Sequence, residues 1–154
     1  MSTTDSVTTT VDVGVDPVTA FEVFTAEIDA WYQRGPHSWK HPERAVGIRF
    51  EPGVGGRWIE VWDRETGEGF DFGRITAWEP GERLVFDYLL HDGGHVTEVE
   101  IRFEAIDGGT RVLLEHRGWD ALPAAVAAEG VANVQKGEPV LLEWFAEYLG
   151  KEQR

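Results

Sequence analysis

Two ionisable side chains stand among apolar neighbours in segments that alternate like β-strands. His116 in "TRVLLEHRG" has the same parity as Val112 and Leu114, so it faces inward with them if this segment is a strand. Glu60 in "RWIEVW" lies two residues from a tryptophan on either side and shares their alternation. A polar group enclosed by apolar side chains needs a partner, and enclosed imidazole and carboxyl groups commonly transfer protons. Glu60 and His116 are therefore candidate catalytic residues.

Arg74 could complete this set as a counter-charge, because it shares the parity of Phe70 and Phe72. Together, Glu60, Arg74 and His116 would suit the acid–base steps of a cyclase or a hydrolase. A buried ion network without chemistry explains the same pattern, as does a structural histidine with satisfied hydrogen bonds. The sequence leaves these interpretations open.

Other kinds of chemistry lack their residues. There is no cysteine and no serine in a G-x-S-x-G motif, which excludes the usual nucleophiles and thiolate metal sites. His37 and His41 are four residues apart, as are His91 and His95, but both pairs lie in Pro- or Gly-rich segments that do not aim two rings at one ion. The glycine-rich run "FEPGVGGRWIE" lacks the lysine and hydroxyl of a phosphate-binding loop. We expect no metal and no cofactor.

The charge of the chain excludes several classes of partner. Its 154 residues include 14 Lys and Arg against 28 Asp and Glu, a net charge of -14. This balance argues against nucleic acid and against an anionic membrane surface, which both require a basic face. The N-terminus has no basic segment followed by an apolar run, and no apolar stretch is long enough to span a membrane. We expect a cytoplasmic protein.

The elements that would position these side chains are one N-terminal helical region and a meander of strands. An edge strand is expected over residues 7–15, and a helix starts after Asp16, a suitable cap, with Pro17 in its first turn. A second short helical piece is expected at 28–31. The remaining strands are expected at 45–51, 57–64, 69–79, 83–90, 96–105 and 110–117. The short Gly-containing connections are typical of an antiparallel meander.

The C-terminal segment is helical in pattern. Apolar residues recur with helical spacing from Val140 to Leu149. Gly130, Gly137 and Pro139 predict an interruption, so we expect a short helix near 121–129 and a longer one that bends around Pro139. Strands followed by a long helix indicate an α+β fold in which this helix covers one face of the sheet.

The order of elements and several motifs resemble a known family. "FEPGVGGRWIE", then "GFDFGRITAWEPGERLVFDY" and "TEVEIRFEAIDGGTRVLLEHRGW", are similar to the activator of heat-shock protein 90 ATPase homologue family. This family belongs to the START-like (SRPBCC, birch-pollen-allergen-like) superfamily. The resemblance implies a helix-grip fold, in which a curved antiparallel sheet wraps a long C-terminal helix around a hydrophobic cavity. We expect one such domain at 7–150, a disordered tail at 1–6 and a C-terminal tail at 151–154.

Aromatic residues are numerous enough to line such a cavity, with seven tryptophans and eight phenylalanines. Core packing explains any single ring, but rings from the loop, the sheet, the strand end and the helix would border a helix-grip cavity. The candidate ligand-binding residues are Trp39, Phe72, His116, Trp119 and Trp144. We therefore predict that the protein binds a small hydrophobic molecule, such as a lipid, a polyketide or an aromatic metabolite.

Two alternatives stand beside this prediction, because fold alone does not choose a function. The first is a polyketide cyclase-like or hydrolase-like enzyme that uses the same cavity. The second is a chaperone co-activator or another protein-interaction module. Eukaryotic co-chaperones of this family carry an extra N-terminal domain that makes much of the chaperone contact, and the length of this chain argues against that role. The sequence leaves a homodimer open.

Overall fold

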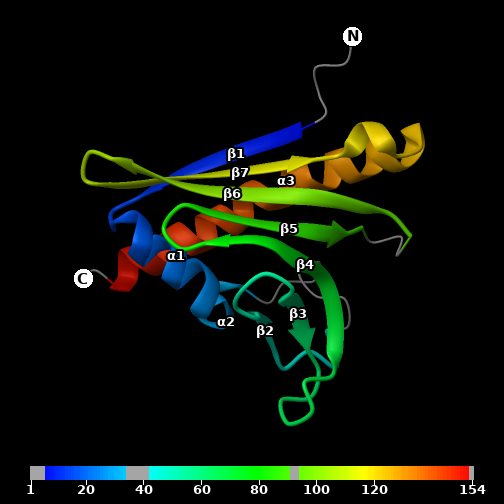
Figure 1. The fold of residues 1–154 in the computed structure, drawn as a ribbon, viewed down its shortest axis with the longest axis horizontal. Coiled ribbons are helices and arrows are strands. Elements are labelled where there is room, and N and C mark those ends of the chain that lie inside the picture. Colours follow the sequence, from blue (N-terminus) through cyan, green and yellow to red (C-terminus); the bar gives the residue numbers. More distant parts are fainter. Residues whose placement is uncertain (1–5, 34–41, 91–93, 153–154) are drawn as a thin grey trace.

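The chain folds into one curved antiparallel sheet with a long helix on its concave side (Figure 1). The computed structural model describes residues 6–33, 42–90 and 94–152. The strands are β1 (Ser6–Val13), β2 (Gly47–Phe50), β3 (Arg57–Val61), β4 (Gly69–Glu79), β5 (Arg83–Leu89), β6 (Val96–Ile106) and β7 (Gly109–Arg117). The helices are α1 (Pro17–Ala26), α2 (Ile28–Trp31), a 3-10 turn at Trp119–Ala121 and α3 (Ala124–Glu152). Strand order is β1-β7-β6-β5-β4-β3-β2, which confirms the predicted α+β helix-grip fold.

The N-terminal elements close one end of the sheet. β1 pairs with β7 at the edge, with Val7 opposite His116. Asp16 has the extended backbone of a helix cap, and α1 starts at Pro17 as predicted, although the Asp16 side chain makes no capping hydrogen bond. β1 begins at Ser6, one residue before the predicted start of the domain, and residues 1–5 of the predicted tail lie outside the described ranges.

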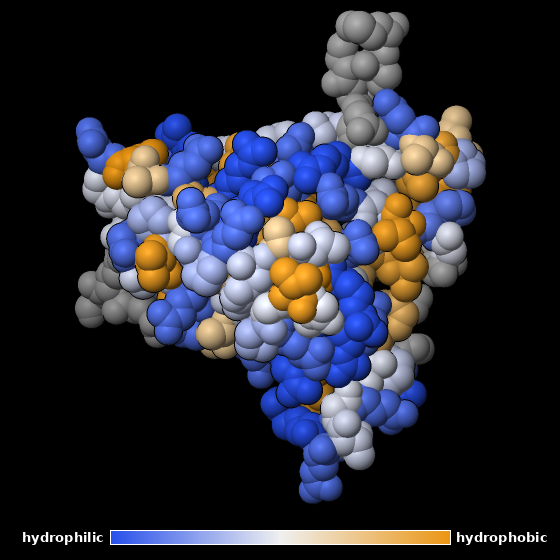
Figure 2. Space-filling model, in the orientation of Figure 1, coloured by the Kyte–Doolittle hydropathy of each residue, from blue (hydrophilic) through white to orange (hydrophobic). Residues whose placement is uncertain are grey.

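The two faces of the sheet differ as the alternation predicted. On β6, Val99, Ile101 and Phe103 are buried on the inner face. The face seen in Figure 2 is mostly hydrophilic, with scattered hydrophobic patches. On the outer face of the sheet the carboxylate of Glu100 is only 2 % exposed, and Arg117 Nη1 lies 2.6 Å from it. Apolar residues therefore face the helix, and charged residues face the solvent.

Local irregularities set which side chains of β3 and β4 face inward. Gly53 and Gly55 have φ values of 91° and 89°, so "PGVGG" is a turn that only glycine adopts readily. Further along, the pairing of β3 with β4 shifts register: Trp58 is opposite Gly73, but Ile59 is opposite Asp71. This bulge reverses the parity of β4, because it places one extra residue on that strand.

The C-terminal helix differs from the sequence prediction. α3 is continuous from Ala124 to Glu152 and contains Pro139, where two helices had been expected. Pro139 removes one backbone hydrogen bond, but contacts hold the helix on both sides of it: Glu138 is hydrogen-bonded to His116 at 2.7 Å, and Leu142 and Phe145 are buried in the core. The helix also includes residues 151 and 152, so the predicted C-terminal tail at 151–154 starts too early.

The two halves of α3 pack differently. The C-terminal half buries Leu142, Phe145 and Leu149, and the Phe145 ring lies 5.2 Å from Phe24 and 5.4 Å from Trp31, measured between centroids. Val140, the first apolar residue of the predicted helical pattern, is 40 % exposed and does not belong to this buried face. The N-terminal half spans the sheet at a distance and leaves a space beneath it.

Candidate ligand-binding site

A cavity of about 1060 Å³ lies between the inner face of the sheet and the N-terminal half of α3. α1 and α2 close one end of it with Phe24, Ile28 and Trp31, and β5, β6 and β7 form its floor. On the helix side, several lining residues are exposed, including Glu129 and Lys136, so the cavity opens to solvent there. Its volume is that of a drug-sized ligand site.

Aromatic side chains form a large part of the wall. The lining rings are Phe24, Trp31, Tyr32, Phe50, Trp58, Phe86, Tyr88 and Trp144. They hold one another in place: Phe50 stacks on Trp58 at 5.4 Å and 17°, and Tyr32 meets Trp144 edge to face at 5.5 Å. Such a wall offers broad apolar contact and specific ring geometry to a flat ligand.

A chain of polar side chains leads from the interior of the sheet to this cavity. His116 is fully buried. Its Nε2 is 2.5 Å from Thr97 Oγ1, and its Nδ1 is 2.7 Å from Glu138 Oε2. With a carboxylate acceptor at Nδ1, the neutral ring carries its proton there, and Nε2 accepts from the Thr97 hydroxyl. Glu138 lies on α3 and lines the cavity, so the histidine ties the helix to the sheet and orients this carboxylate.

Two tyrosines of the wall are held in the protonated form. Burial, and then the charge of Glu138, raise the pKa of Tyr88 to about 12. Burial also raises the pKa of Tyr32, with smaller contributions from Tyr88 and Glu60. Both hydroxyls therefore keep their protons at neutral pH and remain able to donate a hydrogen bond.

Two buried polar atoms of this wall are met by no protein group in the described ranges. They are Glu138 Oε1 and Trp58 Nε1. A buried donor or acceptor without a partner costs about 1–3 kcal/mol, so such atoms are rare in folded proteins. Both belong to residues that line the cavity, and both atoms are themselves enclosed by neighbouring protein atoms.

The five residues predicted to bind ligand lie at different depths. Trp144 lines the cavity. His116 and Trp119 are buried together behind the wall, with ring centroids 4.6 Å apart, and Trp119 Nε1 donates to the His116 carbonyl oxygen at 2.9 Å. Phe72 is also behind it and packs on Trp58 at 4.9 Å. Trp39 lies outside the described residues.

The three candidate catalytic residues do not form one group. Glu60 is fully buried on the inner face and accepts a hydrogen bond from Trp62 Nε1 at 2.7 Å. Arg74 is exposed, and its guanidinium lies 3.7 Å from Asp71. The bulge explains the difference, because it places Arg74 on the face opposite to the one that its parity with Phe70 predicted. His116 is hydrogen-bonded to Glu138, a residue that lines the cavity.

Sequence reasoning missed the two most informative residues of the site. Glu138 stands in line with Leu142, Phe145 and Leu149, at spacings of four, three and four residues, so a carboxylate occupies the apolar stripe of α3. That position was a usable signal. The face of Trp58 could not be assigned from sequence, but its pairing opposite Phe50 places it on the inner face.

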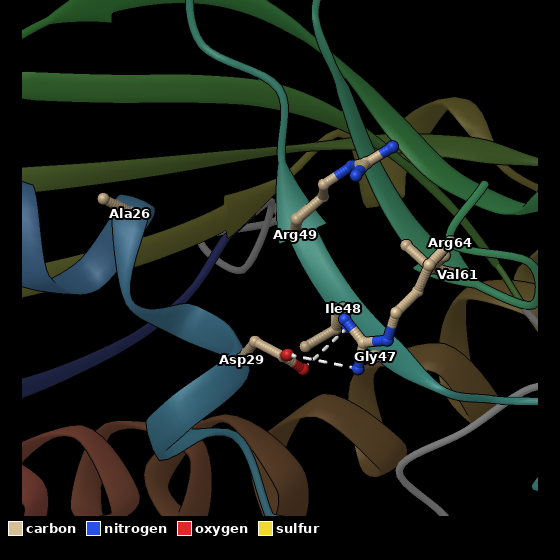
Figure 3. A pocket seen from close by; sticks show the side chains of 7 residues that line it. All are labelled: Ala26, Asp29, Gly47, Ile48, Arg49, Val61 and Arg64. Atoms are coloured by element: carbon tan, nitrogen blue, oxygen red, sulfur yellow. Dashed lines mark hydrogen bonds and ion pairs between the residues drawn. The ribbon is translucent and has the colours of Figure 1, made fainter. Parts of the chain in front are cut away.

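A second, smaller cavity of about 170 Å³ lies between α2 and the edge of the sheet (Figure 3). Asp29 Oδ1 accepts from the backbone N–H of Ile48 at 3.0 Å, and Asp29 Oδ2 lies 3.7 Å from Arg64. The Arg49 side chain points away from this pair (Figure 3). Both carboxylate oxygens of Asp29 therefore already have partners, and these contacts hold α2 against β2.

The described residues include neither a cluster of metal ligands nor a helix that could span a membrane. No three acidic, histidine or cysteine side chains are grouped to hold a metal in the ranges described. Of the four spaced histidines, His37, His41 and His91 fall outside those ranges. Across the described helices, none has both the length and the apolar character required to cross a bilayer.

The sheet, the gripped helix and the cavity between them define a helix-grip protein of the START-like type. The model of the family described as activator of Hsp90 ATPase homolog 1-like protein matches residues 15–150. The chain therefore belongs to this family, as its motifs predicted. No curated protein matches the chain significantly.

Solved structures of similar proteins share the whole fold. Protein MLL2253 from Mesorhizobium loti matches with a TM-score of 0.69 at 17% identity, over 95% of this chain and 97% of that one. The AHSA1-like protein from Aeromonas hydrophila matches with a TM-score of 0.65 at 22% identity, over 96% and 94%. CalU16 from Micromonospora echinospora matches with a TM-score of 0.63 at 17% identity, over 96% and 78%. At these identities the likeness shows the fold alone.

Proposed function

We propose that the protein binds a small hydrophobic molecule, of the lipid, polyketide or aromatic metabolite kind, between the sheet and α3. The observation that carries this proposal is the cavity of about 1060 Å³ with its aromatic wall. Protein interiors are packed without spaces of this size, so a cavity this large at the centre of a fold is best explained by an occupant. Family membership agrees with a ligand-binding fold.

The test is a titration with N-phenyl-1-naphthylamine, a neutral probe that fluoresces strongly in apolar surroundings. We expect saturable binding with one site per chain. Replacing both Val126 and Val134, which line the cavity from α3, by tryptophan fills part of the space and should weaken the probe about tenfold or more. The control is Ala128→Trp with Ala132→Trp, at exposed positions of the same helix outside the cavity lining.

The control pair should bind the probe as the unchanged protein does. Absence of saturable binding, or equal binding by the blocked and control variants, would remove the support for a ligand site beneath α3. Far-ultraviolet circular dichroism of each variant verifies that the helix is retained.

One observation favours a second candidate, an acid–base enzyme of the cyclase or hydrolase kind in the same cavity. Glu138 is a lining residue of the cavity and its Oε2 lies 2.7 Å from His116 Nδ1, and an oriented carboxylate in an apolar site is a suitable proton acceptor. Turnover of a cyclisable or hydrolysable substrate that Glu138→Gln abolishes, with binding retained, would establish this activity. Binding without turnover would leave the carrier or receptor function.

A further inference from the structure

The two halves of α3 differ in how firmly the core holds them. In the C-terminal half, Leu142, Phe145 and Leu149 are at most 3% exposed. Over residues 124–141, all of which the structure describes, no residue is buried. A segment with few buried contacts opens locally at a low cost in free energy. The N-terminal half is therefore the part of the helix that can move while the rest stays in place.

The boundary between the two halves contains residues that weaken a helix. Pro139 lacks the N–H that would bond to the carbonyl oxygen of Gln135, and its ring crowds the preceding turn. Gly137, two residues earlier, has the greatest backbone freedom, and a Cβ there would have no atom within 4 Å. Sharp bends in helices occur mainly at such residues. Gly137 and Pro139 together therefore form a hinge between the exposed half and the buried half.

We propose that residues 124–137 form an arm that bends about Gly137 and Pro139 and controls access to the cavity. Val126 and Val134 line the cavity from this arm, so an outward bend widens the opening, and the return brings these side chains onto a molecule inside. The movement of the arm belongs to the free protein. Only its closure on a bound molecule rests on the proposed binding function.

The hinge itself is anchored to the sheet. Glu138 stands between Gly137 and Pro139, and its Oε2 lies 2.7 Å from Nδ1 of the buried His116. The other ring nitrogen, Nε2, lies 2.5 Å from Thr97 Oγ1 on β6, so the histidine is held as well. An anchor at the point of rotation keeps the axis in place and leaves the arm free to turn. His116 is therefore a positioning residue for the hinge.

The other end of the arm has its own pivot and a surface on which it rests. Gly118, just before the 3-10 turn, has a φ of 98°, which glycine adopts far more readily than other residues. Trp119 is fixed by its hydrogen bond to the His116 carbonyl oxygen at 2.9 Å. Gly130 of the arm lies against this ring, since a Cβ there would be 2.5 Å from Trp119 Cζ3. A side chain at position 130 should therefore hold the arm away from the sheet.

The experiment measures distances between spin labels by double electron–electron resonance, and the absence of cysteine from the chain makes labelling specific. One pair is Ala128→Cys on the arm with Glu104→Cys on β6, and the control pair is Glu147→Cys on the C-terminal half with Glu104→Cys. All three positions are exposed. Ala128 lies about 16 Å along the helix from Pro139, so a bend of about 20° moves its label by about 5 Å. We expect a second, displaced population for the first pair only.

Three variants test the parts of the device. Gly137→Ala with Pro139→Ala stiffens the hinge, so it should remove the displaced population and slow the association of N-phenyl-1-naphthylamine about tenfold. The control is Gly150→Ala, in the C-terminal half of the same helix, where a Cβ also has no atom within 4 Å. It should change neither quantity. Gly130→Ala should act in the opposite direction and enlarge the displaced population.

The outcomes separate this inference from the proposed function. A single narrow distance for both pairs in the free protein, or equal broadening of both, would overturn the arm, whether or not the variants fold. If the arm moves but the stiffened hinge admits the probe at an unchanged rate, its control of access is overturned. If saturating probe leaves the displaced population unchanged, closure on a bound molecule is refuted. If N-phenyl-1-naphthylamine does not bind at all, the proposed function fails, and the distances in the free protein still decide whether the arm moves.

Discussion

Glu100 provides the sharpest test of the electrostatics on the outer face of the sheet. Its side chain is 2 % exposed and meets three arginines, with Arg117 at 2.6 Å, Arg102 at 2.9 Å and Arg83 at 3.4 Å. Burial by itself would raise the pKa of this carboxyl. The hydrogen bonds from Arg102 and Arg117 outweigh burial and lower the pKa from 4.5 to about 2.

The size of the effect follows from that shift. One pKa unit corresponds to about 1.4 kcal/mol, so the change from 4.5 to about 2 sets an upper limit of about 3 kcal/mol. Arg83 and Arg102 are 40% and 48% exposed, and solvent screens such pairs. We therefore expect Glu100→Gln to lower the free energy of unfolding by about 1–2 kcal/mol at pH 7.

The pH dependence has a definite sign. Because the pKa of Glu100 is lower in the folded protein than in the unfolded chain, its stabilisation is fully present above about pH 4.5 and is lost as the pH falls towards 2. Urea denaturation of both proteins at pH 7, 5, 4 and 3 measures this, with Glu104→Gln, exposed on the same strand, as control. A difference that stays constant from pH 7 to pH 3, or no difference at pH 7, would refute the reasoning.

Two further predictions concern the packing behind the cavity. A Cβ at Gly130 would lie 2.5 Å from Trp119 Cζ3, whereas one at Gly137 would have no atom within 4 Å. Gly130→Ala should therefore lower the melting temperature, and Gly137→Ala should stabilise the helix by about 1 kcal/mol; equal shifts in thermal denaturation would contradict the contact with Trp119. Thr97→Val removes the hydroxyl that His116 Nε2 meets and should cost about 1–3 kcal/mol in urea denaturation. The same change at exposed Thr10 should cost less than about 0.5 kcal/mol, and equal costs would remove the role given to the Thr97 hydroxyl.

Local patterns predicted most of the fold. β4 spans Gly69–Glu79 and α2 spans Ile28–Trp31, at the predicted bounds. These elements are marked by short-range signals, namely alternation between turn residues or an apolar pair beside a cap. Such signals need no knowledge of the rest of the chain, which is why they were readable from sequence.

Where a distant contact decided the outcome, local patterns failed. Arg74 faces outward because β4 contains a bulge, and the bulge is stabilised by pairing with β3 rather than by the residues beside Arg74. A Cβ at Gly73 would lie 1.5 Å from the Asp87 carbonyl oxygen. Gly73 was therefore the one signal in the sequence for a close approach between these strands. Likewise, α3 continues through Pro139, with Glu138 bonded to His116 before it and Leu142 buried after it.

The sequence also could not predict how deeply each aromatic ring lies in the core. Alternation distinguishes the inner from the outer face of a strand, but it does not separate a ring that lines a cavity from one that supports the wall. Trp119 and Phe72 stand behind the wall, whereas Trp58 and Phe24 belong to it. That difference depends on the curvature of the sheet and on the height of α3 above it, which arise only when the elements assemble.

One stripe of α3 links stability to recognition. Its C-terminal members, Leu142, Phe145 and Leu149, are buried in the core. The next member towards the N-terminus is Glu138, which is hydrogen-bonded to His116 and lines the cavity. The apolar half fixes the helix, so the carboxylate is held in place by packing that a ligand does not touch. Groups on a rigid element lose little freedom when a ligand binds. Substitutions on the N-terminal side of Leu142 should therefore alter ligand choice more than stability. Substitutions from Leu142 to the C-terminal end should alter stability more than ligand choice.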